Sequence, residues 1–220
     1  MQTRSTSRAA AALLLPLIGL SSTAQAHRDE TQLWVSQSVS TKVDSATTLS
    51  LDTSERFLDT PTARHQYLAR IAADRRVAQG VEVGGGITWS QINHVNEVRP
   101  FEQLTLSRGL FVLRSRIEQR MFDNADGTVW RLRERLQLAV PLDGKKRWTA
   151  TVNGEGLFNL NSVNISKQTG LTQVRALIGV RRTLGARLSL ALSYQRQQTL
   201  VAGGEDVVTH QPIMAIVLRL

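Results

Sequence analysis

The residues best placed to do chemistry are charged side chains that occupy every second position in two neighbouring segments. They are, in order, Arg114, Arg116, Glu118, Arg120, Arg131, Arg133 and Arg135. Side chains two residues apart share one face of a β-strand. Guanidinium groups bind carboxylates and phosphates through paired hydrogen bonds. The pattern therefore predicts a strand face that holds either an ion-pair network or bound anions.

The two segments are joined by Asp123–Gly127, which is rich in turn-forming residues. The faces opposite the arginines are largely apolar, with Ile117, Leu132 and Leu136 among their members, and Glu134 is the exception. A soluble β-sandwich would bury the apolar faces and expose the arginines. A membrane barrel would turn the apolar faces to lipid and the arginines to its lumen.

The N-terminus has the pattern of a cleaved signal peptide. Arg4 and Arg8 precede the apolar run Ala9–Leu20, and Ala24-Gln25-Ala26 fits the small-x-small cleavage rule. The apolar run is too short to span a membrane as a helix. We expect residues 1–26 to be a Sec-type signal peptide cleaved after Ala26, with a retained anchor as the alternative, and residues 27–220 to form one domain.

Composition narrows the class of protein further. The 220 residues include no cysteine and carry a formal net charge of +9. Outside the N-terminal segment no run approaches the length of an apolar transmembrane helix, so the mature chain can enter a membrane only as a closed barrel. Export and the alternation of arginine with apolar residues argue against a nucleic-acid partner, although the charge is basic.

The mature chain repeats a unit of alternating residues followed by turn residues. This periodicity predicts eleven strands: 32–40, 46–57, 65–76, 80–91, 99–107, 110–122, 128–140, 147–158, 171–182, 187–198 and 207–220. The segment Ala63–Ala78 also has good helical propensity, but its alternation favours a strand.

The connectors are expected to alternate between short turns and longer polar loops, as in outer-membrane barrels. Segments 92–98 and 123–127 count among the longer ones. The predicted fold is an all-β, antiparallel up-and-down transmembrane β-barrel of about ten to twelve strands with a charged Arg/Glu lumen. An odd strand count conflicts with the even number usual for such barrels.

Aromatic residues fall near the predicted strand ends, where amphipathic rings sit at the lipid headgroup level. The expected interfacial aromatics are Trp34, Trp89, Trp130, Trp148, Phe158 and Tyr194.

Charged residues on the polar faces are expected to meet inside the barrel. The predicted lumen ion-pair network is Glu102, Arg114, Arg116, Glu118, Arg120, Arg131, Arg133, Arg135, Glu155 and Arg175. Further members of the polar faces include Asp52, Arg56 and Arg70. One interpretation is a structural ladder that fills a small barrel, because unpaired buried charges are costly. The other is a positive constriction that favours anions.

Signs of catalysis are weak. The sequence has no HExxH, no GxSxG and no metal-ligand spacing, so we expect no catalytic residue, metal or cofactor. Gly84-Gly85-Gly86 is expected to allow a bulge, sharp curvature or close packing against a large luminal side chain. An outer-membrane lipid-modifying enzyme remains an alternative, with His210 and a nearby serine as its candidate residues.

The order of these features resembles the DUF2490 family, uncharacterised outer-membrane barrel proteins of Gram-negative bacteria. The most specific part is Arg114-x-Arg116-x-Glu118-Gln119-Arg120 followed by Arg131-x-Arg133. The further matching features are Trp34, the strand 51–56, Tyr67, the glycine-rich strand 81–89, Glu102-Gln103 and Glu155. The resemblance implies location and fold, and it implies no reaction, substrate or active site.

The leading functional hypothesis is an outer-membrane barrel of structural or narrow-pore, porin-like character. Its expected partners are outer-membrane lipid and the export and barrel-assembly machinery, and the protein is expected to be a monomer. A soluble periplasmic β-protein is the second alternative.

Overall fold

The computed structural model describes residues 27–60, 63–164 and 166–220, which form eleven β-strands. The strands are β1 (His27–Lys42), β2 (Thr47–Leu58), β3 (His65–Ala78), β4 (Val81–Ile92), β5 (Val95–Arg108), β6 (Phe111–Phe122), β7 (Ala125–Pro141), β8 (Trp148–Asn159), β9 (Gly170–Leu184), β10 (Leu188–Thr199) and β11 (Asp206–Arg219). Each predicted strand segment is a strand, and the segment with a helical alternative lies in β3. The described part of the chain contains no helix long and apolar enough to cross a membrane. The predicted signal peptide lies outside the described residues.

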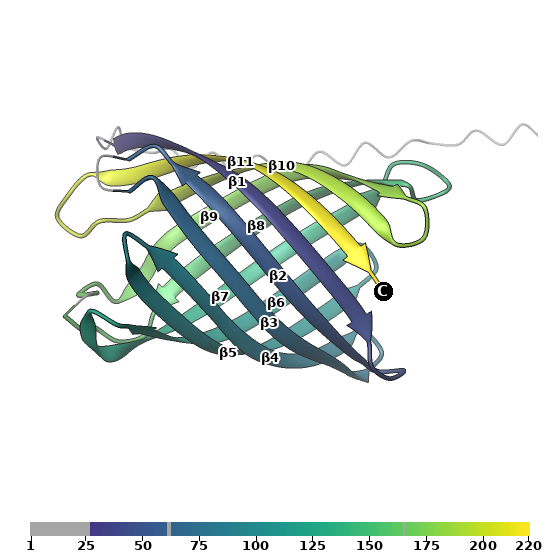
Figure 1. Ribbon diagram of the computed structural model, residues 1–220, viewed down its shortest axis with the longest axis horizontal. Coiled ribbons are helices and arrows are strands. Elements are labelled where there is room, and N and C mark those ends of the chain that lie inside the picture. Colours follow the sequence, from purple (N-terminus) through teal and green to yellow (C-terminus); the bar gives the residue numbers. More distant parts are fainter. Residues whose placement is uncertain (1–26, 61–62, 165) are drawn as a thin grey trace, which may run out of the picture.

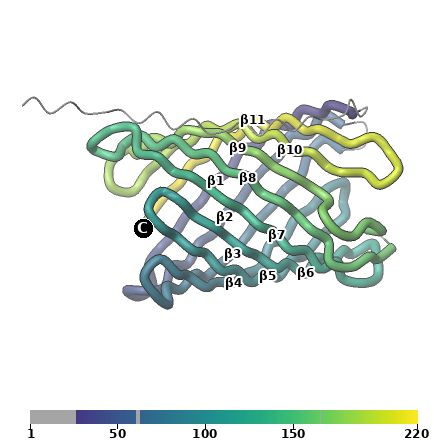
Figure 2. Tube along the Cα trace, turned by 180° about the vertical axis from the view of Figure 1, so that it is seen from behind, coloured from purple at the N-terminus to yellow at the C-terminus, as the bar shows by residue number. Residues whose placement is uncertain are grey.

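The strands close into a barrel, tilted against its long axis (Figures 1 and 2). Neighbours in sequence pair antiparallel throughout. The closing pair, β1 with β11, is parallel, with Ser36 opposite Ala215. The all-β barrel and its strand count are confirmed. The parallel seam differs from a wholly antiparallel barrel because, with an odd number of strands, the first and the last run in the same direction.

The two ends of the barrel differ. We call the end with the connectors 59–64, 160–169 and 200–205 the loop end, and the end with the C-terminus the turn end. In Figure 1 the turn end is on the right. The predicted alternation of connector lengths is only partly right, since β4–β5 and β6–β7 are joined at the loop end by turns of two residues. Asn93 and His94 adopt φ of 48° and 64° there, which is the left-handed geometry of a tight hairpin.

Asp44 stabilises one connector at the turn end. Its carboxylate accepts hydrogen bonds from the backbone N–H groups of Ala46 (2.7 Å) and Thr47 (2.6 Å). These bonds favour the charged form and lower the pKa of the Asp44 carboxyl.

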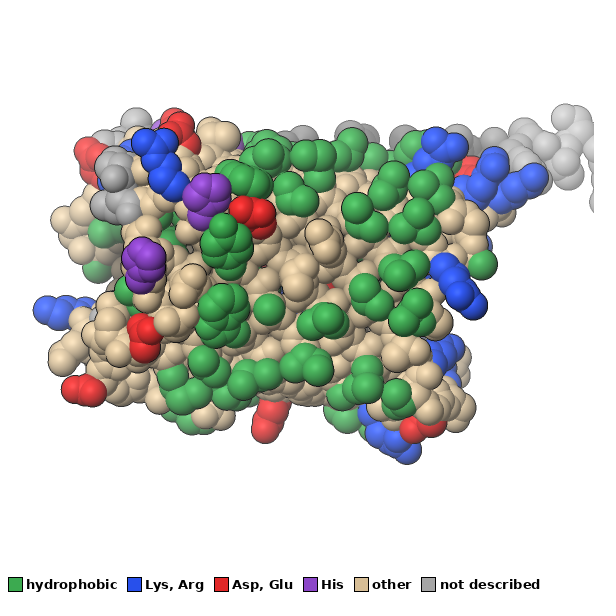
Figure 3. Space-filling view, viewed as in Figure 1, with side chains coloured by type: hydrophobic (Ala, Val, Ile, Leu, Met, Phe, Trp, Pro, Cys, Tyr) green, Lys and Arg blue, Asp and Glu red, His purple; other side chains and the backbone are tan. Residues whose placement is uncertain are grey.

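The outer wall is apolar. Leucine, isoleucine and valine side chains from several strands are more than half exposed, namely Leu51, Ile71, Leu136, Val152, Ile178 and Leu192. On the face shown in Figure 3, hydrophobic side chains occupy the middle and charged ones gather mostly at the two ends. A large exposed apolar surface of this kind marks an interaction site for a protein or a membrane.

The inner wall holds the barrel's polar residues and a close packing contact. Gly86 of β4 faces Phe101 of β5 across the ladder. A Cβ on Gly86 would lie 2.9 Å from the Phe101 ring and would collide with the Ile71 carbonyl. The glycine-rich strand therefore allows the predicted close approach of a large luminal side chain, the buried Phe101.

Candidate functional site: an arginine-rich lumen

The interior of the barrel is lined by far more arginines than carboxylates. Around the main cavity lie ten arginines and four carboxylates, an excess of six positive charges. The carboxylates are Asp52, Glu97, Glu118 and Glu155, and the arginines are Arg56, Arg70, Arg99, Arg114, Arg116, Arg120, Arg131, Arg133, Arg135 and Arg175. Strand alternation brings them together, because each occupies an inward position of β2, β3 or β5 to β9.

Glu118 of β6 is the first centre of the network and is 2% exposed. It accepts hydrogen bonds from Arg131 Nε (2.9 Å) and from Arg133 Nη1 (2.8 Å), both on β7. Arg116 Nη1 lies 3.6 Å from the same carboxylate. Removal of this carboxylate would leave several buried cations without their counter-charge.

Glu155 of β8 is the second centre. It accepts hydrogen bonds from Arg114 Nη2 (2.9 Å) and Arg133 Nη2 (2.8 Å), and Arg175 Nη1 lies 3.4 Å away. Arg133 therefore bridges both carboxylates, and the network ties β6, β7, β8 and β9 together inside the barrel.

Glu97 of β5 is a third buried carboxylate that the sequence prediction missed. It pairs with Arg99 Nε at 2.9 Å and with Arg120 Nε of β6. The prediction placed residues 92–98 in a connector, whereas β5 begins at Val95. The every-second spacing of Glu97, Arg99 and Phe101 is the signal that could have identified it.

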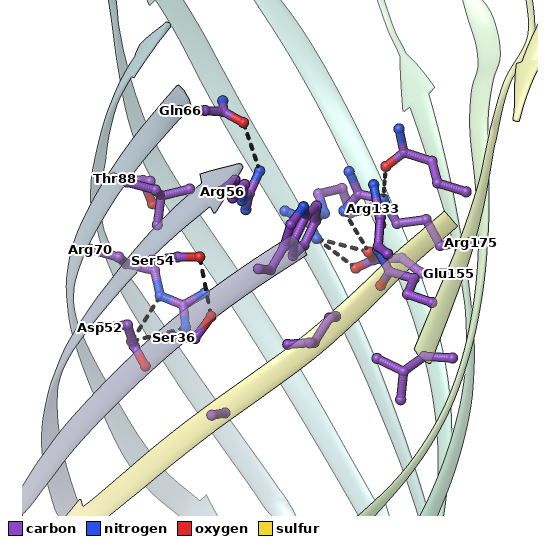
Figure 4. Close-up of a pocket in the computed structure, with 18 of the residues that line it drawn as sticks. Ser36, Asp52, Ser54, Arg56, Gln66, Arg70, Thr88, Arg133, Glu155 and Arg175 are labelled. Carbon is purple, nitrogen blue, oxygen red and sulfur yellow. Dashed lines mark hydrogen bonds and ion pairs between the residues drawn. The ribbon is translucent and has the colours of Figure 1, made fainter. Parts of the chain in front are cut away.

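The opposite side of the lumen carries a looser cluster (Figure 4). Asp52 of β2 accepts hydrogen bonds from Arg70 Nε (3.0 Å) and Nη2 (2.9 Å) of β3. Arg56 donates to the Gln66 side chain at 3.1 Å, and its guanidinium stacks 3.8 Å from the Trp34 ring centroid. A cation held over an indole face keeps its charge available to a further partner.

Two of the ten arginines around the main cavity form no salt bridge with a carboxylate among the described residues, although Glu97 attracts Arg56 and Glu155 attracts Arg135 at longer range. Arg56 contacts the neutral side chains of Gln66 and Trp34, and Arg135 forms no ion pair or hydrogen bond with the other described residues. The Nε atoms of both are buried and unpartnered. The guanidinium groups of Arg175, Arg99 and Arg133 repel Arg56 across the lumen.

The two ends of the lumen differ in their inward side chains, and a second cavity of about 470 Å³ at the loop end shares Gln32 and Gln66 with the main cavity. Near the loop end the inward side chains of Leu58, Val129 and Leu157 are 8%, 0% and 0% exposed. Toward the turn end, inward residues such as Ser38 and Thr151 are small and half-exposed. A cavity of about 630 Å³ extends between the arginine network and these small side chains.

Two predicted site residues lie elsewhere than expected. Glu102 is exposed on the outer wall, in the alternation of Leu104 and Leu106, so it does not belong to the lumen network. The prediction assigns Glu102 to the lumen because it is charged. Alternate residues of a strand point to opposite faces, however, and Glu102 shares the outward face of Leu104. Trp34 is 8% exposed and lies in the lumen under Arg56, so it is not an interfacial aromatic.

The other predicted interfacial aromatics lie on the outer wall. Trp89, Trp130 and Trp148 are 39%, 37% and 39% exposed, Tyr194 is 42% exposed, and Phe158 is half-exposed. Trp148 at the turn end is contacted by Arg182, whose Cζ lies 5.1 Å from the ring centroid. Glu134, the exception on the apolar face, accepts a hydrogen bond of 2.5 Å from Ser115 Oγ.

His210 lies on the outer wall near the loop end, with Thr31 of β1 and Arg196 of β10 as its neighbours across the ladder. Its Nδ1 is 2.6 Å from Tyr194 Oη, and its Nε2 is 3.4 Å from Asp29 Oδ1. Within the described ranges, no group of three or more histidine and carboxylate side chains is arranged to hold a metal ion.

Comparison with known proteins gives one match. The family model described as "Protein of unknown function (DUF2490)" matches residues 31–208. This range runs from β1 into β11 and includes every member of the arginine network. No curated protein matches the chain.

Proposed function

The chain belongs to the DUF2490 family, and we propose from its geometry that it is an outer-membrane β-barrel whose lumen binds small anions that enter from the turn end. The observation that carries this proposal is the excess of arginine around an internal cavity, with two arginines that have no carboxylate partner. A structural ladder would need only enough arginine to balance its acids. A bound anion would balance the excess positive charge of the arginines and so explain it.

The distribution of side chains supports the membrane location. Apolar side chains cover the middle of the outer wall, and the paired charges lie inside. A soluble β-protein distributes them the other way, because water solvates charges at its surface. The predicted signal peptide supports export, and the long connectors of the loop end are proposed to face outward.

Cell fractionation tests the location. We expect the protein to stay in the membrane fraction after carbonate and salt washes and to migrate faster on a detergent gel before boiling than after it. Release into the soluble fraction by salt or carbonate without detergent would favour the soluble periplasmic alternative.

The packed loop end argues for an occluded lumen rather than a general porin. Glu118 and Glu155 tie the inner faces of four strands through Arg133, and Leu58, Val129 and Leu157 fill the lumen beyond them. Passage of ions would require this packing to open. The anion is therefore proposed to bind in the lumen from one side and not to diffuse freely through it.

Planar-bilayer recording separates an occluded barrel from a narrow pore. Purified wild-type protein is expected to show no steady conductance above background at either polarity. The matched variant replaces Leu58, Val129 and Leu157 by alanine, which removes apolar packing at the loop end. This variant is expected to conduct, with anions favoured over cations. Steady anion-selective conductance of the wild-type protein would establish the narrow pore instead.

A non-catalytic role is part of the proposal. Tyr194 and Asp29 contact both ring nitrogens of His210, and all three side chains lie on the exposed outer wall. We expect purified wild-type protein in mixed micelles to leave phospholipid intact, with the His210→Ala variant indistinguishable from it. Lipid turnover that His210→Ala abolishes would favour the lipid-modifying enzyme.

A further inference from the structure

We propose that the natural ligand of the lumen is a phosphorylated, hydroxyl-rich small molecule of the sugar phosphate class. This inference rests on the anion binding proposed above and adds the chemistry of the rest of the ligand. It comes from an asymmetry of the cavity, whose two sides present different kinds of hydrogen-bonding group.

The charged side of the cavity supplies the site for the phosphate. Arg135 on β7 belongs to this side, Arg56 on β2 lies at its border with β1, and both line the same cavity. Neither has a carboxylate partner among the described residues. Guanidinium groups bind phosphate oxygens through paired, charge-assisted hydrogen bonds, which makes an anion with several oxygens a better fit than a halide.

The neutral side of the cavity supplies sites for hydroxyl groups. Gln32 on β1, Gln195 on β10 and Gln211 on β11 line it beside Ser36 and Ser38. Their side chains are joined by hydrogen bonds, from Gln195 to Gln211 and from Gln211 to Gln32 at 3.5 Å. Carboxamide and hydroxyl groups both donate and accept hydrogen bonds, as sugar hydroxyls do, whereas a phosphate oxygen at neutral pH mainly accepts.

The size and polarity of the cavity fit such a ligand. The volume of about 630 Å³ lies within the range of small-molecule sites, roughly 300–1,000 Å³, and exceeds what one phosphate ion needs. Most of the lining side chains are charged or polar, and the Trp34 ring is already covered by Arg56. A fatty-acid chain would leave these polar groups without hydrogen-bond partners, which disfavours apolar anions.

Calorimetric titration of the purified barrel in detergent micelles tests the inference. The probes are glucose 6-phosphate, inorganic phosphate and glucose at matched ionic strength. We expect glucose 6-phosphate to bind about tenfold more tightly than inorganic phosphate, because neutral hydrogen bonds add to the charged ones, and glucose to show no measurable binding. Equal affinity for the two phosphates would overturn this inference and leave the anion proposal intact. Failure of both phosphates to bind would overturn the anion proposal as well.

Variants assign the two halves of the ligand to the two sides of the cavity. Arg135→Gln removes no ion pair of the folded protein, and it should weaken the binding of both phosphates about tenfold. Gln195→Leu should lower the affinity for glucose 6-phosphate toward that of inorganic phosphate. Ser36→Ala provides a milder test of the same side if Gln195→Leu does not fold. Glu102→Gln on the outer wall is the matched control and should change neither affinity. An unchanged preference for glucose 6-phosphate in both neutral-side variants would contradict the inference.

Discussion

Arg133 shows how the lumen holds so many positive charges. Its Nη1 donates to Glu118 and its Nη2 donates to Glu155, with distances of 2.8 Å in each case. Each carboxylate also accepts from an arginine on another position of the wall, Arg131 and Arg114 respectively. Together with the longer contacts of Arg116 and Arg175, two acids thus serve five cations, and these shared bonds lower the cost of burying them together.

Replacing Glu118 by glutamine is expected to destabilise the barrel by about 3 kcal/mol, because it leaves Arg131 and Arg133 with less counter-charge in a buried position. Urea unfolding in detergent micelles, followed by tryptophan fluorescence, measures the change. The control is Glu102→Gln, which alters an exposed carboxylate on the outer wall and should change the free energy of unfolding by less than about 0.5 kcal/mol. Equal effects of the two substitutions would contradict the assignment of Glu118 to the lumen.

At the residue scale, strand parity predicted the site better than residue type did. The every-second spacing from Arg114 to Arg120 and from Arg131 to Arg135 correctly identified an inward wall. Glu102 was assigned to the lumen because it is an acid, although its neighbours Leu104 and Leu106 show that its face is outward. Trp34 was assigned to the interface as an aromatic, and no local pattern shows that Arg56 covers it inside the barrel.

At the element scale, the glycine-rich strand β4 is shaped by its neighbours on both sides. Gly86 lies against the Ile71 carbonyl of β3 and the Phe101 ring of β5. The Cζ atom of Arg116 lies 4.1 Å from the centroid of the same ring. Glycine usually weakens a strand. At position 86 glycine is required, because the neighbouring strand and the Phe101 ring leave no room for a side chain.

Gly86→Ala is expected to destabilise the barrel by about 1–3 kcal/mol, because the new methyl group overpacks the contact with Phe101. The matched control is Gly154→Ala on β8, where the nearest heavy atom, the Arg175 carbonyl oxygen, lies 4.0 Å from the added Cβ. Urea unfolding midpoints compare the two. A larger loss for Gly154→Ala than for Gly86→Ala would show that the packing of β4 differs from the one described.

The parallel seam between β1 and β11 can be tested by disulfide trapping, since the chain has no cysteine of its own. Ser36 and Ala215 face each other in the register, so Ser36→Cys with Ala215→Cys should form a disulfide under mild oxidation. The control pairs Ser36→Cys with Val217→Cys, which is displaced by two positions and should remain reduced. Mobility on a non-reducing gel reports the bond, and crosslinking of the control pair alone would place the seam in another register.

The positions of the strands were predictable from the sequence, whereas the pairing that closes the barrel was not. Local alternation located all eleven strands, because one side of each strand is apolar over most of its length. The seam was not predictable, because the choice of partner for β1 depends on the whole ring. Polar residues continue into the paired ends of the strands at Asn93-His94 and Asp123-Asn124, so the sequence predicts longer loops where the structure has two-residue turns.

At the scale of the whole molecule, the lumen of the barrel differs between its two ends, and charged side chains lie between them. Buried apolar side chains lie toward the loop end, the arginine network follows them along the lumen, and small hydroxyl-bearing residues line the lumen toward the turn end. Excess positive charge in a narrow, low-dielectric cavity concentrates anions and repels cations. The proposed occluded lumen and the proposed anion site both depend on this one-ended arrangement.

Thiol labelling of single cysteines tests that arrangement most directly. Ser38 lies in the cavity toward the turn end, and Ser90, which is 1% exposed, lies toward the packed loop end. The purified Ser38→Cys variant should react with small charged methanethiosulfonates, and faster with the negative reagent than with the positive one. The Ser90→Cys variant should react with neither on the same timescale. Equal reaction at both positions, or faster reaction of Ser38→Cys with the positive reagent, would contradict a positively charged lumen that opens at one end.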